Sequence, residues 1–141
     1  MRWLAALALL LIAGCGIQNS DAIDAGPAPS GLGSGPRLFF VKDGRLQSVV
    51  RQVEGFDDVT TRLRLLLAGP IDEERDLTTA LPAGLRLVSV APDLITLTGS
   101  ATVPRLGLQQ VACTATYDGR GLRRIKLPSG VVETALCPPW P

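Results

Sequence analysis

Few side chains in this sequence are suited to catalysis. The chain has 141 residues, with three cysteines and no histidine. Without histidine, neither a Ser-His-Asp triad nor a Cys-His pair can activate a nucleophile, and the commonest zinc ligand is missing. Carboxylate pairs remain as candidates for acid–base chemistry, from Asp57, Asp58, Asp93, Asp118 and Glu133. We expect the first two to cap a helix, and Asp93 and Asp118 to form turns. The sequence therefore predicts no catalytic, metal-binding or cofactor-binding site.

The first fifteen residues have the pattern of an export signal. Arg2 gives a positive start, and residues 4–12 form an apolar run that leads into Ile12-Ala13-Gly14-Cys15. The run is too short for a membrane-spanning helix, which needs about 20 apolar residues. The pattern resembles the lipobox of bacterial lipoproteins. That resemblance implies cleavage after residue 14, a diacylglycerol on the Cys15 sulfur, an added acyl chain such as palmitate, and a place on the extracytoplasmic face of the cell membrane. The alternative is an ordinary cleaved secretory signal.

Charge and composition bound the segment after the signal. The chain has 14 basic and 13 acidic side chains, and Arg2 lies in the signal, so the mature protein is balanced. We expect no nucleic-acid partner, which would need a basic stripe, and little overall attraction to anionic lipid. Residues 15–36 are rich in Gly, Pro and Ser and poor in large apolar side chains. They predict a flexible tether with a reach of roughly 25 Å.

The first half of the folded part begins at residue 37. Residues 38–53 predict a hairpin around Asp43-Gly44. Residues 59–68 carry an apolar stripe at helical spacing, and Gly69-Pro70 is expected to end that helix. Residues 71–80 contain four clustered acids without the spacing of a calcium loop, so we expect a solvated loop or a frayed helical turn.

The second half repeats this order of elements. Residues 85–98 predict a hairpin, Pro104 opens a second helix, and residues 122–127 predict a strand. The result is an α+β domain, with a mostly antiparallel sheet of about five strands and two helices packed on one face. In the last strand, alternation directs Ile125 and Leu127 inward and Arg124 and Lys126 outward. This outward pair is either an anion-facing strip or a solvated, charge-guarded face.

Four blocks of sequence resemble a known family. They are residues 65–70 (Leu-Leu-Leu-Ala-Gly-Pro), 79–90, 109–116 and 122–130, and together they resemble the GerMN domain of sporulation and spore-germination proteins. The resemblance covers about residues 39 to 130. It implies an extracytoplasmic domain, often in a lipoprotein, that binds a ligand or partner and has no catalytic residues to carry over. Cys113 departs from the family's tendency to carry a large aromatic in the second helix.

Backbone-restricted residues stand at both ends of the loop between the first helix and the next strand. A held loop of this kind is a possible binding position, and its residues are Gly69, Pro70, Leu81, Pro82 and Gly84. The alternative is that they only specify topology. We therefore expect a lipid-anchored, monomeric, non-enzymatic module that binds a small ligand or an envelope protein. The alternatives are a hydrolase of envelope polymers and a structural assembly factor of an envelope complex.

Two cysteines remain once Cys15 is assigned to lipid. In an oxidising compartment, Cys113 and Cys137 are expected to form a disulfide. Residues 131–141 extend beyond the predicted domain of residues 37–130, and their prolines predict a tail without regular secondary structure that the bridge holds in place. The alternative is two free thiols.

Overall fold

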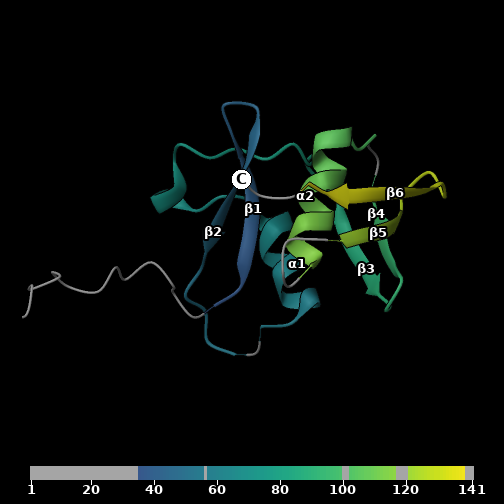
Figure 1. The fold of residues 1–141 in the computed structure, drawn as a ribbon, viewed down its shortest axis with the longest axis horizontal. Helices are drawn as coiled ribbons and strands as arrows, with labels where there is room; N and C mark the ends of the chain where they lie inside the picture. The colour runs from purple at the N-terminus through teal and green to yellow at the C-terminus, as the bar shows by residue number, and fades with distance from the viewer. Residues whose placement is uncertain (1–34, 56, 100–101, 117–120, 139–141) are drawn as a thin grey trace, which may run out of the picture. The chain divides into compact units, whose positions relative to one another are not determined.

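The computed structural model describes residues 35–55, 57–99, 102–116 and 121–138. The predicted signal, Cys15, most of the predicted tether and Asp118 lie outside these residues. The described residues form two α-helices, one short 3-10 helix and six strands, which confirms the predicted α+β class (Figure 1). In chain order the elements are β1 (Arg37–Lys42), β2 (Arg45–Val50), α1 (Val59–Ala68), η1 (Asp72–Glu74), β3 (Arg86–Val90), β4 (Leu94–Thr98), α2 (Arg105–Ala115), β5 (Gly121–Lys126) and β6 (Val132–Cys137).

The strands form two sheets, where the sequence predicted one. β1 and β2 make an antiparallel hairpin on their own, and the other four strands lie in the order β3-β4-β5-β6. Within the larger sheet β4 and β5 run parallel, because α2 lies between them in the sequence, and the other pairs are antiparallel. A bulge interrupts the pairing of β3 with β4 between Leu87 and Ser89.

The helices are the reason for this division. α1 packs against β1 and β3, and α2 packs against β1, β5 and β6, so both helices lie between the hairpin and one face of the larger sheet (Figure 1). We call the sheet face toward the helices the inner face. The core joins buried side chains from all three layers, among them Leu38, Phe40, Leu63, Leu66, Ile95, Val111 and Ile125. The expectation that both helices cover one face of a sheet is confirmed for the four-stranded sheet.

The edge of β1 that faces away from β2 is closed by other means than a strand. Val41 exchanges two backbone hydrogen bonds of 2.8 Å with Thr78. The Phe39 amide donates to Thr114 Oγ1 at 3.2 Å, and the Phe39 carbonyl accepts from Gln110 Nε2 at 2.9 Å. Thr114 and Gln110 are four residues apart on α2 and share a helix face. Because these contacts satisfy the backbone donors and acceptors at the edge of β1, the hairpin needs no neighbouring strand.

Helix α1 has the predicted start and end. Asp58 is the N-cap, and its Oδ1 accepts a hydrogen bond from the Thr61 amide at 2.9 Å. Gly69 follows the last turn with φ 87°, a conformation that glycine adopts without a side-chain clash. Asp57, the other cap candidate, instead forms a bidentate ion pair with the buried Arg62, whose Nη2 lies 2.7 Å from Asp57 Oδ2.

The C-terminal segment differs from the sequence prediction. Residues 132–137 form β6, which pairs with β5 over six residues, so the prediction of a tail without regular secondary structure is wrong for this part. The prolines at 138 and 139 follow the strand, so no backbone donor is lost within it. Ala135 and Cys137 are buried against the helices. The domain therefore continues past residue 130.

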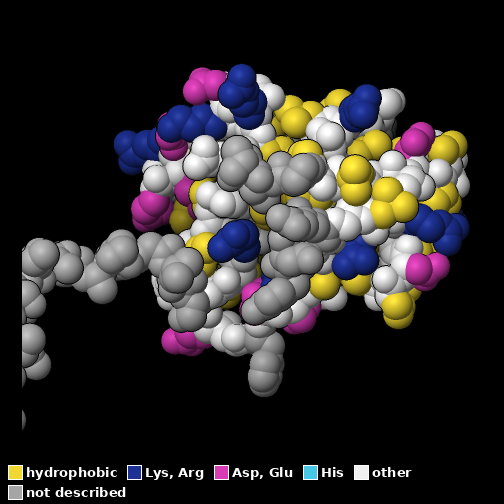
Figure 2. Space-filling model, in the orientation of Figure 1, with side chains coloured by type: hydrophobic (Ala, Val, Ile, Leu, Met, Phe, Trp, Pro, Cys, Tyr) yellow, Lys and Arg dark blue, Asp and Glu magenta, His cyan; other side chains and the backbone are white. Residues whose placement is uncertain are grey.

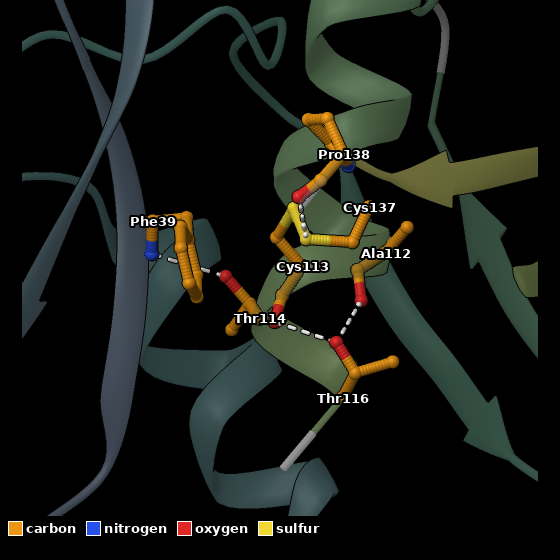
Figure 3. The surroundings of a disulfide bond; sticks show 7 residues. All are labelled: Phe39, Ala112, Cys113, Thr114, Thr116, Cys137 and Pro138. Atoms are coloured by element: carbon orange, nitrogen blue, oxygen red, sulfur yellow. Dashed lines mark hydrogen bonds between the residues drawn. A yellow bond between two sulfur atoms is a disulfide. The ribbon is translucent and has the colours of Figure 1, made fainter. Parts of the chain in front are cut away.

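The predicted disulfide joins α2 to the end of β6. Cys113 and Cys137 are bridged, with sulfur atoms 2.01 Å apart and Cα atoms 4.7 Å apart (Figure 3). Both half-cystines are buried and pack with Phe39 of β1. The bridge therefore fixes β6 to α2 at the point where α2 also meets the hairpin. Neither helix of the described residues has the length and apolar content required to cross a bilayer.

Candidate functional site

A buried arginine follows β2 and organises the surrounding loops. The Arg51 side chain is only 7% exposed, and its Nε and Nη2 donate to the two carboxylate oxygens of Glu74 at 3.0 and 2.6 Å. The guanidinium also lies over the Phe40 ring, 5.1 Å from its centroid. Bidentate pairing and stacking on an aromatic ring are both characteristic of guanidinium in partly buried sites.

The same guanidinium contacts the last turn of α1. Arg51 Nη2 donates to the Gly69 carbonyl at 2.8 Å, and Nη1 donates to the Leu65 carbonyl at 3.4 Å. The carbonyls at a helix C-terminus lack partners within the helix and carry partial negative charge. Arg51 therefore ties together the end of β2, the end of α1 and η1.

Glu74 is held in its ionised form. Its hydrogen bonds from Arg51 are the main reason that the pKa of Glu74 lies below its usual value, and the Ile71 amide donates a further bond of 3.2 Å to Oε2. Burial acts in the opposite direction but is the weaker influence. A carboxylate that is ionised and engaged in this way is a poor general acid.

A cavity of about 520 Å³ opens beside this ion pair. β2 and the residues that follow it form one wall, and α1 and the η1 loop form the other. The lining residues are Val49, Val50, Arg51, Gln52, Val53, Leu65, Ile71, Glu73 and Glu74. Ile71 is 46% exposed at its rim. The cavity thus combines apolar walls with a fixed charge pair, the composition typical of ligand pockets.

A smaller cavity of about 210 Å³ shares three of these residues, Val49, Glu73 and Glu74. Lys42 and Asp76, which form an exposed ion pair, also line it. The hydrogen bond from Lys42 lowers the pKa of Asp76. We call the two cavities together the β2 groove, because residues of β2 line both.

The chain just before β1 supports the same junction. The Arg51 amide donates to the Pro36 carbonyl at 3.1 Å, and Pro36 is fully buried. A Cβ atom on Gly35 would lie 2.2 Å from the Arg51 carbonyl oxygen, so only glycine fits there. Their composition predicts that Gly35 and Pro36 belong to the tether, but the structure places them in the folded part.

The predicted binding-loop residues are divided between two places. The Gly69 carbonyl contacts Arg51, whereas Leu81 is buried and packs toward Gly107 of α2. Gly69 and Gly84 both have positive φ, of 87° and 81°, so both ends of the loop are conformationally specified as expected. None of Gly69, Pro70, Leu81, Pro82 and Gly84 lines the β2 groove. The intervening residues of the same loop do so.

The four candidate acids that the structure describes have separate roles. Asp57 pairs with Arg62, Asp58 caps α1, and Asp93 lies 3.1 Å from Arg124 in an exposed ion pair. Glu133 lies on β6. In the described part of the chain, no three side chains of Cys, Asp or Glu are grouped so that they could hold a metal ion.

No motif in the sequence marks Arg51 or Gln110 as a functional residue. Arg51 interrupts the apolar run Val49-Val50-Arg51-Gln52-Val53, and Gln110 stands within the apolar face of α2, where it is fully buried. A charged or amide side chain inside an apolar stretch implies a buried partner, because an unpaired one would be costly. The polar residues within these apolar stretches are visible in the sequence, but the sequence does not identify the residues that they contact.

Comparison of the chain with known proteins gave no match to a family model, to a curated protein or to a solved structure. The resemblance to GerMN domains therefore rests on the four sequence blocks.

Proposed function

We propose that this protein is a lipid-anchored extracytoplasmic lipoprotein whose GerMN-like domain is a non-enzymatic binding module. The lipobox supports the anchor. Over residues 37–126, the order hairpin, helix, hairpin, helix and strand supports the domain type, since the four resembling blocks fall on the end of α1, on β3, on α2 and on β5. The paired or capping roles of Asp57, Asp58 and Asp93 argue against a hydrolase.

The observation that carries the binding role is the β2 groove. Its larger cavity, at about 520 Å³, lies within the range of roughly 300–1,000 Å³ found for ligand sites. Its walls are held by Arg51, which fixes β2, α1 and η1 relative to one another, so the groove is preformed. A preformed cavity costs less ordering entropy on binding than one that must close around its ligand. The lining suits a largely apolar ligand with a polar group that reaches Gln52 or Glu73.

The anchor is tested by metabolic labelling with a fatty acid. The wild-type protein should take up label and fractionate with membranes, whereas Cys15→Ser should do neither. Equal labelling of the two proteins, or no labelling of the wild type, contradicts the lipoprotein assignment.

The groove is tested by photocrosslinking in intact cells. A photoreactive amino acid in place of Ile71, at the groove rim, should give a discrete adduct. The same amino acid in place of Arg64, which is exposed on α1 and does not line the groove, is the matched control. Filling the groove with Val53→Trp should abolish the Ile71 adduct. An adduct that is equal at both positions, or that survives Val53→Trp, contradicts binding in the groove.

A further inference from the structure

The outer face of the four-stranded sheet, opposite the helices, carries apolar and basic side chains side by side. β5 and β6 pair in register, and alternate pairs point to the same face. Three such pairs form what we call the outer ladder: Leu122 with Leu136, Arg124 with Thr134, and Lys126 with Val132. The leucines are 59% and 55% exposed, and Val132 is 40% exposed.

This exposure is unusual because the leucines are paired. Single exposed apolar side chains are normal on protein surfaces, but two leucines that face each other across a ladder form a patch. The inner face of the same strands is buried, with Ile125 and Ala135 packed in the core. Figure 2 shows hydrophobic, basic and acidic side chains interspersed over the part of the molecule where Figure 1 labels β5 and β6.

The charges around this patch are mostly of one sign. Arg86 of β3 pairs with Thr98, and both are exposed on the same side as the outer ladder. Together with Arg124 and Lys126 it gives three cations. Asp93, in the turn before β4, offsets Arg124 in an exposed pair. Glu133 does not offset the others, because it pairs with the buried Ile125 and points away from this face.

We propose that the outer ladder rests on an anionic lipid surface. The proposal relies on the lipid anchor of the proposed function, since the anchor brings the domain to a membrane. The predicted tether of about 20 residues is expected to reach roughly 25 Å, which corresponds to an effective concentration in the millimolar range. A face with weak affinity for the membrane is then sufficient for docking, because each cation near an anionic membrane favours the docked state about fivefold. Leu122, Leu136 and Val132 enter the headgroup region.

Charge complementarity selects lipid over a second copy of the chain. A symmetric dimer through this face would bring the same patch of both copies together. Arg124 and Lys126 of one copy would then approach the same cations of the other, which is unfavourable. The mature chain is neutral overall, so its attraction to an anionic surface is local to this face and orients the domain.

The test uses the mature lipidated protein reconstituted into vesicles. Cys15 is acylated and Cys113 is bridged to Cys137, so one introduced cysteine carries an environment-sensitive probe. Thr134→Cys places it on the outer ladder, and Ala68→Cys places it on an exposed position at the end of α1 as a control. Quenching by headgroup-labelled lipid should be strong for Thr134→Cys in vesicles containing phosphatidylglycerol. It should fall to the Ala68→Cys level in phosphatidylcholine alone, or at high salt.

Variants then separate the two contributions. Arg86→Ser and Lys126→Ser should each lower the docked-to-undocked ratio about fivefold, and Leu122→Ser with Leu136→Ser should lower it without changing the salt dependence. Thermal unfolding checks that these exposed changes leave the fold intact.

Equal quenching at both probe positions, or quenching that does not depend on phosphatidylglycerol, overturns the proposal. So does energy transfer between Thr134→Cys probes in phosphatidylcholine, which would indicate a second copy. The intact mass reports acylation separately, and Ile71 crosslinking reports the groove, so failure here is distinct from failure of the proposed function.

Discussion

Two junctions hold the layers of this domain together, and they do so by different means. At one, Arg51 joins β2, α1 and η1 through hydrogen bonds to Glu74 and to two helix carbonyls. At the other, a disulfide joins α2 to β6, and Cys113 and Cys137 pack with Phe39 in an apolar cluster. The first junction borders a cavity of about 520 Å³, whereas the second is fully buried.

The comparison indicates that the Arg51 junction can contribute both to binding and to stability, whereas the disulfide contributes only to stability. At the polar junction, Arg51 and Glu74 are themselves part of the cavity wall. A covalent junction in an apolar cluster closes the space around it. We therefore expect changes at Arg51 to affect stability and the groove together, and changes at the disulfide to affect stability alone.

The largest effect is expected from Arg51→Met. Removing one partner of a buried ion pair leaves the other charge uncompensated, which costs about 3–5 kcal/mol. Glu74 is only 11% exposed in its side chain, and the carbonyls of Gly69 and Leu65 also lose their donor. The free energy of unfolding in urea measures the loss. The double variant Arg51→Met with Glu74→Leu should recover much of it. A single variant as stable as wild type would mean that the junction does not support the fold.

The disulfide is expected to contribute nearly as much. Its cysteines are 24 residues apart, and closing a loop of this length removes about 3–4 kcal/mol of unfolded-state entropy in the chain model. Urea unfolding with and without reductant measures this, and Cys113→Ala with Cys137→Ala is the matched variant. Because β6 pairs with β5 along its whole length, hydrogen exchange should increase near residue 137 while β5, α1 and α2 stay protected. Alkylation of two thiols without prior reduction would show that the bridge is absent in solution.

A smaller effect is expected where α2 meets the edge of β1. Gln110 is fully buried, donates to the Phe39 carbonyl at 2.9 Å and accepts from the Ala80 amide at 2.7 Å. Gln110→Leu keeps the volume but removes both bonds, which should cost about 1–3 kcal/mol for the buried polar groups left behind. Thermal and urea unfolding measure it, and Gln109→Leu on the same helix, at a half-buried position, is the control. An equal loss in the control would assign the effect to the helix surface in general.

The smallest expected effect is the part of the stability that depends on pH. The pKa of Glu74 is lower in the folded protein than its ordinary value of 4.5, so its contribution to stability is complete above about pH 4.5 and is lost as the pH falls through the folded pKa. Glu74→Gln should therefore lower the stability at neutral pH and flatten its decline below pH 4.5. Asp76→Asn, which alters an exposed pair, should flatten the curve less, and its effect should disappear at high salt. A wild-type curve as flat as that of Glu74→Gln would rule out this role.

The sequence predicted most of the secondary structure because its signals are local. Asp43-Gly44 marks the first hairpin, Asp58 and Gly69 bound α1, and all three positions have the expected roles. The C-terminal strand was missed because the prolines at 138 and 139 were given weight over the residues before them. Residues 132–137 contain alternating inward and outward positions, but without its partner β5 such a short run is not distinct from a loop.

The candidate sites depend on contacts between distant residues. Arg51 and Glu74 are 23 residues apart, and the sequence around either residue does not predict that the two form an ion pair. The sequence predicted one part of the outer ladder, the outward direction of Arg124 and Lys126. It did not predict that Leu136 and Val132 lie next to them, because that depends on the pairing of β6 with β5. The apolar character of the outer ladder could not have been found from β5 alone.

The sequence by itself determined the α+β class, the ends of α1 and the pairing of Cys113 with Cys137, because helix caps, turn residues and a count of cysteines act within short stretches or by elimination. The tertiary structure alone decided that the strands divide into two sheets, that Arg51 meets Glu74 beside a groove, and that β6 completes a face of leucines and cations. Each of these three features depends on which surfaces the two helices cover. Packing across the whole domain decides this coverage, and no local sequence pattern predicts it.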